Sequence, residues 1–378
     1  MNRCYLVSIL MFSALLRAQS PEVSPQQMVQ DAMQKQQAGD LAGAVAGYKQ
    51  FLKLHPEATP IHANLGAALA GLGHYEEAIS EYKIALKQSP SLSAARLNLA
   101  LAYYKMGRIS DASIQLVRVH RQDPSNTQTE LLLGDCYLRM GQNRETIALL
   151  QPLAKAHPDD LAVAYMLGTA LLRNKQRDEG AAVIDRILRN GDSAEAHLLL
   201  GMTRFEAMEY PEAIADLMKA ATLNPDLPDV YSYLGQAQMA SGDMQAARAA
   251  FEKELTLNPN DFESNMRLAV LLKQDGNYER AHQLLDRALL VRPKDPGALY
   301  QVGAIYLAAG DMNRALSALE ALVKQYPEFL EPHVSLAQVY YRLKRKEDGD
   351  REREIVQKLK AEQDAQQSKT KGEAQPRP

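Results

Sequence analysis

The chain has 378 residues and a formal net charge of −3, from 43 Lys and Arg against 46 Asp and Glu. Nucleic-acid binding needs Lys and Arg in concentrated excess, so this balance argues against a nucleic-acid partner. Trp is absent, and good helix formers such as Ala, Leu, Glu, Lys and Gln are abundant, which predicts an all-α chain.

The first twenty residues have the pattern of a secretory signal. Arg3 supplies a positive charge, Leu6–Leu16 is an uncharged apolar run, and small residues follow at Ala18 and Ser20. The run is too short to span a bilayer comfortably, which favours a signal peptide over a transmembrane helix.

We therefore expect residues 1–18 to be a signal peptide and 19–24 a spacer, with an exported protein that is periplasmic or secreted. In the alternative, residues 5–16 are retained as a membrane anchor. After cleavage Cys136 is the only cysteine, so no intramolecular disulfide is possible.

From about residue 25 the sequence repeats every 34 residues, with one interval of 33. A small residue recurs at this spacing, a second small residue follows twelve positions later, and a proline twelve later again, as at Gly66, Ala78 and Pro90. In most units a glycine such as Gly73 lies between the two small residues. Glycine ends a helix without steric cost and proline cannot continue one, so each unit is predicted to be helix, turn, helix.

This pattern resembles the tetratricopeptide repeat, whose Leu-Gly, Gly, Ala and Pro positions stand here as Leu65, Gly66, Gly73, Ala78 and Pro90. The resemblance implies a right-handed α-solenoid superhelix with a C-terminal capping helix. We count nine full repeats and a degenerate tenth, near residues 25–58, 59–92, 93–126, 127–160, 161–193, 194–227, 228–261, 262–295, 296–329 and 330–363.

One repeat departs from the pattern. Between residues 161 and 193, Lys175 replaces the turn glycine, and Asn190, Gly191 and Asp192 replace the proline turn with the loss of one residue. Asn-Gly still forms a turn, so we expect either a local change of superhelical pitch or a neutral deletion.

The end of the chain is highly charged. Residues 345–363 read as a polar helix that caps the stack, because the last repeat has no neighbour to cover it. Residues 364–378 contain no large apolar side chain and are predicted to be a disordered tail.

No catalytic constellation is present in the sequence. H-E-x-x-H, Walker, G-x-S-x-G and C-x-x-C motifs are all absent. Glu76 and Glu77 open a helix, where carboxylates favour the positive end of its dipole, and Cys136 occupies a small packing position. The sequence therefore predicts a protein that is not an enzyme and has no cofactor or metal site; a remote alternative is an accessory subunit of an enzyme such as a glycosyltransferase.

The remaining candidate is a surface. In the tetratricopeptide repeat family, one face of each first helix lines a concave groove that binds peptide segments. The corresponding positions here are mostly apolar, and an exposed apolar face of this extent is typical of a binding site. The partner-binding groove is therefore predicted to contain Asn64, Asn98, Leu101, Tyr104, Leu131, Asp135, Leu138, Tyr165, Thr169, Leu172, Leu198, Met202, Phe205, Gln236 and Met239.

The sequence thus predicts a protein–protein interaction scaffold of the cell envelope, whose partner is a protein or peptide segment and not a nucleic acid or small-molecule substrate. A membrane-tethered assembly factor is the alternative if the N-terminal segment is retained. A second open alternative concerns the groove itself, because tight superhelical coiling would bury part of the apolar stripe as core.

Overall fold

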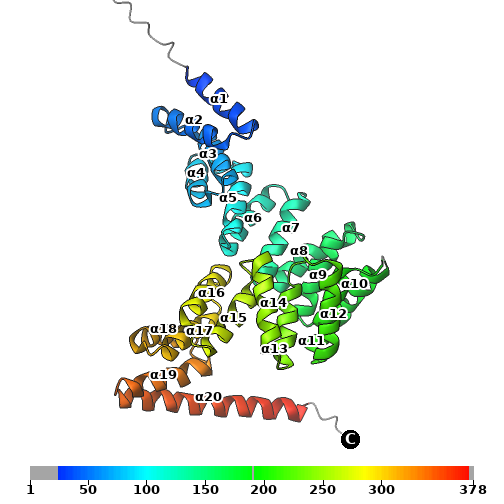
Figure 1. The fold of residues 1–378 in the computed structure, drawn as a ribbon, viewed down its shortest axis with the longest axis vertical. Helices are drawn as coiled ribbons and strands as arrows, with labels where there is room; N and C mark the ends of the chain where they lie inside the picture. The colour runs from blue at the N-terminus through cyan, green and yellow to red at the C-terminus, as the bar shows by residue number, and fades with distance from the viewer. Residues whose placement is uncertain (1–23, 190, 374–378) are drawn as a thin grey trace, which may run out of the picture. The chain divides into compact units, whose positions relative to one another are not determined.

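The computed structural model describes residues 24–189 and 191–373, which form twenty α-helices and no strand (Figure 1). The predicted all-α solenoid of helix pairs is confirmed, since consecutive helices such as α3 (Thr59–Gly71) and α4 (Tyr75–Gln88) pack together along the described chain. The predicted signal peptide and the alternative anchor lie outside the described residues. Within the described residues, no helix combines the length and the apolar character needed to cross a membrane.

The chain divides into two compact units, residues 1–95 and 96–378. The first unit also holds α1 (Pro25–Gln37) and α2 (Leu41–Leu54), and α5 (Ser93–Lys105) contains the boundary. The helices of the second unit are α6 (Ile109–Gln122), α7 (Thr127–Arg139), α8 (Asn143–Ala156), α9 (Leu161–Arg173), α10 (Arg177–Arg189), α11 (Ala194–Glu206), α12 (Tyr210–Leu223), α13 (Val230–Ala240), α14 (Met244–Leu257), α15 (Phe262–Gln274), α16 (Tyr278–Val291), α17 (Pro296–Ala308), α18 (Met312–Gln325), α19 (Leu330–Arg342) and α20 (Lys346–Glu373).

Small residues allow the two helices of a pair to cross closely. A Cβ atom on Gly66 would lie 2.7 Å from Tyr82 Cε1, and one on Gly235 would lie 2.6 Å from Phe251 Cε1. In these two pairs the aromatic side chain of the second helix therefore occupies the space that a side chain on the first helix would need.

The turn within each pair uses the left-handed backbone region, as at Gly73 with φ 81°. Three turns place a residue other than glycine there: Lys175 has φ 61°, Met208 has φ 63° and Lys344 has φ 61°. An L-residue in this region costs about 1–2 kcal/mol, so packing on either side of these turns outweighs a local strain.

Histidine fills the fourth position of three first helices and fastens the pair. His62 Nδ1 lies 2.6 Å from Glu81 Oε2, and its Nε2 lies 2.9 Å from the Pro56 carbonyl oxygen. His333 repeats this arrangement with the carboxylate of Glu352 and the carbonyl of Pro327, at the same two distances. Each buried ring thus joins the second helix to the loop before the first.

The segment just before α11 uses the same arrangement with a different partner. His197 Nδ1 lies 3.0 Å from Asp216 Oδ1, while its Nε2 lies 2.6 Å from Asp192 Oδ1. A carboxylate therefore takes the place of the missing proline-turn carbonyl. The predicted change of pitch at this repeat stays a prediction.

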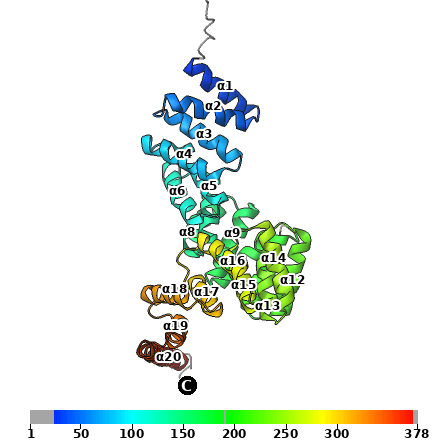
Figure 2. The same cartoon turned by 60° about the vertical axis from the view of Figure 1, so that its left-hand side comes forward.

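The last helix is longer than expected. α20 packs on α19 through Gly349, where a Cβ atom would lie 2.7 Å from Tyr341 Cε1, and it continues to Glu373 (Figures 1 and 2). We expected a disordered tail from residue 364, but strong helix formers such as Glu, Gln, Lys and Ala continue the helix for ten more residues.

The largest core of the second unit is built from α8 to α14, with side chains such as Leu150, Leu199 and Leu217 fully buried. A second cluster joins α14 to α17 around Phe251, and a third joins α18 to α19. These clusters fix the first helices α7, α9, α13 and α15, which supply the candidate site.

Candidate functional site

Side chains of the second unit converge around a cavity of about 330 Å³. They come from α7, α9, the start of α11, the loop between α12 and α13, the start of α15 and the end of α16. The apolar part of the wall comprises Leu138, Leu161, Tyr165, Met166, Leu227 and Phe262. A volume of this size is typical of a ligand site, and the wall combines these apolar side chains with charged ones.

An unusual loop forms one side of this cavity. α13 begins at Val230 and has 11 residues, whereas the other first helices have 13 and begin two residues earlier in their repeats. Pro228 does not cause the delay, because Pro25 and Pro296 each open a helix of the usual length. Instead Asp229 adopts φ 69° and turns out of the helix.

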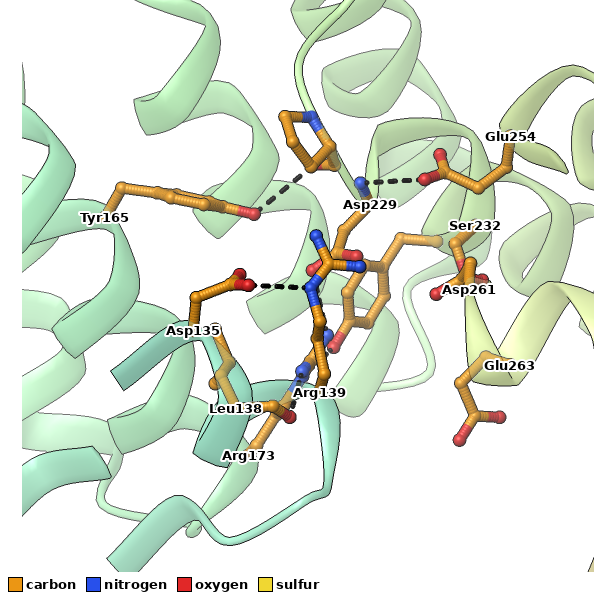
Figure 3. A network of polar contacts seen from close by, with 12 residues as sticks. Asp135, Leu138, Arg139, Tyr165, Arg173, Asp229, Ser232, Glu254, Asp261 and Glu263 are labelled. Atoms are coloured by element: carbon orange, nitrogen blue, oxygen red, sulfur yellow. Dashed lines mark hydrogen bonds and ion pairs between the residues drawn. The ribbon is translucent and has the colours of Figure 1, made fainter. Parts of the chain in front are cut away.

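Two side chains of α9 hold this loop (Figure 3). Tyr165 donates a hydrogen bond of 3.3 Å to the Pro228 carbonyl oxygen, and Arg173 forms an ion pair of 3.1 Å with Asp229. These contacts join residues about two repeats apart in sequence. The strained backbone at Asp229 thus lets its carboxylate point at Arg173.

The Asp229 side chain does not cap α13, and a buried carboxyl group binds the backbone at the start of this helix instead. Glu254 of α14 has no solvent exposure, and its Oε1 accepts a hydrogen bond of 3.2 Å from the Asp229 backbone N–H. Burial, followed by repulsion from Asp261 and Asp229, raises the pKa of Glu254 to about 8. Among the described residues, its other oxygen has no hydrogen-bond partner.

Asp261 adds a third carboxyl group to this side of the cavity. It is the N-cap of α15, and its Oδ1 accepts hydrogen bonds from the Ser264 N–H at 2.7 Å and the Ser232 hydroxyl at 2.9 Å. Burial and the nearby charge of Asp229 raise the pKa of Asp261. Three carboxyl groups are therefore concentrated where α13, α14 and α15 meet (Figure 3).

Three arginines lie among these carboxylates. Arg139 Nε donates to Asp135 at 2.8 Å, and Arg173 Nε donates to the Tyr233 hydroxyl at 2.8 Å. Burial opposes the charge of both guanidinium groups, but their acidic neighbours outweigh it and the pKa of each is raised.

Arg292 closes the cavity from the end of α16. Its Nε donates to the Arg139 carbonyl oxygen at 2.9 Å, its Nη1 lies 3.4 Å from Glu263 Oε1, and its guanidinium carbon lies 3.9 Å from the centre of the Phe262 ring. Burial, and to a lesser extent the charge of Arg173, lowers the pKa of Arg292. The bond to Arg139 connects helices that are four repeats apart.

A second contact supports the same closure. α16 packs against α6, and the turn at Gly107 lies so close to Asn260 that a Cβ atom on the glycine would be 2.6 Å from the amide carbon. Glycine is needed there for both its φ of 73° and this close approach. The second unit therefore coils until turns of its early repeats meet loops of its later ones.

The structure brings together four of the predicted groove residues. Asp135, Leu138 and Tyr165 line the cavity, and Tyr104 lines an adjoining cavity of about 260 Å³. Tyr104 also donates a hydrogen bond of 2.6 Å to Asp135 Oδ2.

Four other predicted groove residues lie inside the core. Thr169 and Leu198 are 0% exposed, Met202 is 2% exposed and Leu172 is 6% exposed. A partner cannot contact side chains that neighbouring helices already cover. The alternative given above, in which coiling buries part of the apolar stripe, therefore describes these four residues.

The other predicted groove residues do not line either cavity. Leu101 is 39% exposed on α5. The rest are partly buried, and a binding role for any of them stays a prediction: Asn64 in the first unit and Asn98, Leu131, Phe205, Gln236 and Met239 in the second. Cys136 is fully buried and burial raises the pKa of its thiol, which fits a packing role.

Sequence reasoning missed the charged part of the site, which consists of Arg173, Asp229, Glu254, Asp261 and Arg292. In the sequence these residues look like the solvated charges of any helical protein. Pro228 does not mark that loop as different, because Pro296 stands at the same place in another repeat junction and opens a helix of the usual length.

Comparisons with known proteins agree with this architecture. Family models described as Tetratricopeptide repeat match residues 69–136 and 238–302, 32–92 and 131–195, and 297–328, and one described as TPR repeat matches residues 201–242. No curated protein sequence matches the chain.

Solved structures show the same fold. The crystal structure of the APC/C hetero-tetramer Cut9–Hcn1 matches with a TM-score of 0.55 and 15% identity, over 89% of this chain and 80% of that chain. A tetratricopeptide repeat protein from Parabacteroides merdae matches with a TM-score of 0.53 and 15% identity, over 70% of this chain and 98% of that chain. At this identity the likeness concerns the fold alone.

Proposed function

The chain belongs to the tetratricopeptide repeat family, and from this premise we propose that it is an exported, non-catalytic scaffold that holds an extended segment of a partner protein in the cavity of its second unit. Proteins of this fold are generally protein–protein interaction scaffolds. The cavity supplies a candidate place for the interaction in this particular chain.

The observation that carries the proposal is the shape of the site. The cavity of about 330 Å³ adjoins the one of about 260 Å³, and Arg139, Pro228 and Asn260 line both. Two adjoining cavities with a shared wall suit an elongated ligand. In an extended segment alternate side chains point to opposite sides, so one segment can place successive anchors in the two cavities.

The apolar wall supplies the binding free energy in this proposal. Leu161, which is 39% exposed, offers most of the apolar surface that a partner can cover, whereas Leu138 and Phe262 line the same space but are each only 4% exposed. Covering apolar surface is favourable by about 25 cal/mol per Å² before the costs of association. The buried polar groups around it set the orientation of the segment.

Site-directed photo-crosslinking tests this function. A photoreactive side chain at Leu161 is expected to capture one partner, and the crosslinked peptide should come from a single segment of that partner. Met218, which is 55% exposed on α12 and lines neither cavity, is the matched control. Equal capture of the same partner from Met218 would contradict binding in the cavity.

Export is a separate part of the proposal, supported by the signal pattern of the first twenty residues. Mass spectrometry of the N-terminus of the native protein tests it. A mature chain that begins near Gln19 is expected, whereas an intact Met1 would indicate a membrane-tethered protein.

A further inference from the structure

The charged groups around the cavity do not balance. Its lining includes five carboxyl-bearing residues, Asp135, Glu195, Asp229, Asp261 and Glu263, against three arginines, Arg139, Arg173 and Arg292. Adding the charged residues of the adjoining cavity, Lys105 and Asp226, leaves the same excess of two carboxyl groups. The site is therefore more acidic than the chain around it.

The arginines are already engaged. Arg139 bonds Asp135, Arg173 bonds Asp229, and Arg292 lies nearest to Glu263. An anionic ligand would have to displace one of these internal carboxylates, at the cost of leaving a buried charge without its partner.

Among the carboxyl groups that line the cavity, two form no ion pair with an arginine. Asp261 accepts hydrogen bonds from the Ser232 hydroxyl of α13 and from the Ser264 N–H at the start of its own helix. Glu195 forms no ion pair with any of the described residues. Glu195 lies in the first turn of α11 and is half-buried. Burial, and after it the neighbouring carboxylates, raises the pKa values of Asp261 and the adjacent Glu254.

We propose that the cavity selects a Lys or Arg side chain on the extended segment that binds there. The aliphatic stem of such a side chain packs against Leu161, Leu227 and Phe262, while its cationic end faces Glu195 and Asp261. The inference rests on the function proposed above and specifies the chemistry of the partner. Charge complementarity of this kind sets specificity, because a like charge at the same place is strongly unfavourable.

Three blocked peptides of about ten residues test the selection, a length that spans several anchor positions at roughly 3.3 Å per residue. They share one Trp, Pro residues that keep the chain extended, and Leu anchors, and they differ only in carrying Lys, Gln or Glu at the remaining positions. The protein has no Trp, so the fluorescence of the peptide reports binding directly. The full-length protein is used, at low ionic strength.

The Lys peptide is expected to bind about tenfold or more tightly than the Glu peptide, with the Gln peptide between them, and added salt should reduce the difference. Glu195→Gln should weaken the Lys peptide several-fold while leaving the Gln peptide unchanged. Glu206→Gln, at the exposed far end of the same helix, is the control and should change neither.

The remaining outcomes separate the two proposals. Equal affinity for all three peptides, lost together on Leu138→Arg, would overturn the charge selection and leave the cavity as a peptide site. Tighter binding of the Glu peptide would also overturn the selection. A failure of every peptide to bind up to millimolar concentration would overturn both the selection and the cavity as the binding site.

Discussion

Replacing Glu254 with Gln tests the electrostatics of the cavity wall. Glu254 is fully buried and its pKa is about 8, against an ordinary value of 4.5. The folded chain therefore keeps a proton on this group over a pH range in which the unfolded chain has released it. The stability that this proton contributes is fully present below about pH 4.5 and is lost as the pH rises through about 8.

The size of the effect follows from the two pKa values. Their difference, at about 1.4 kcal/mol per pKa unit, gives roughly 5 kcal/mol as the upper limit of the change in unfolding free energy across this range. Glu254→Gln removes this titration but keeps an oxygen that can accept from the Asp229 N–H. The variant should match the wild type near pH 5 and be more stable than it near pH 9.

Urea unfolding followed by circular dichroism at about pH 5, 7 and 9 measures the slope of the unfolding free energy against pH. Hydrogen exchange of the α13 and α14 amides shows where in the chain this change occurs. A smaller slope should persist in the variant because Asp261 also titrates above its usual range. Glu252→Gln on the same helix, a surface partner of Arg280, is the control and should leave the slope unchanged. An unaltered pH dependence in Glu254→Gln would refute the reasoning.

Three further predictions concern the turns, the crossings and the closure of the second unit. Lys175→Gly should raise the unfolding free energy by about 0.5–1 kcal/mol, because it relieves the left-handed strain at φ 61°. The gain is smaller than the strain itself, because glycine also increases the conformational entropy of the unfolded chain. Chemical denaturation of the variant measures the change. Gly235→Ala should cost about 1–3 kcal/mol by the same measurement, because the new methyl group meets Phe251, whereas Gly242→Ala is the comparison in which only the φ of 94° is at issue. Arg292→Gln should speed hydrogen exchange in the last turn of α7, because the Arg139 carbonyl loses its donor; unchanged exchange there would show that the contact does not hold the two ends together.

The repeat pattern was legible in the sequence because its determinants are local. Gly66 and Tyr82 lie sixteen residues apart, and their contact decides how two neighbouring helices cross. His62 and Glu81 are likewise within one repeat. Such spacings recur with the period, so reading one unit predicts the others.

Part of the site was predictable for the same reason. Asp135, Leu138 and Tyr165 occupy the groove positions implied by the family resemblance, and all three line the cavity. Leu198 occupies the same kind of position but is fully buried. Position within the repeat fixes the face of the helix on which a side chain lies, but it does not fix how tightly the neighbouring repeats coil over that face.

The charged half of the site was decided by tertiary structure alone. Arg173 meets Asp229 across 56 residues, and Arg292 meets the Arg139 carbonyl across 153. These distances in sequence are set by the accumulated rotation of several repeats, which no single repeat encodes. The sequence by itself determined the helix pairs and their order, through contacts within each repeat. The coiling of the second unit determined which charges lie together, because it brings residues of distant repeats within hydrogen-bond distance.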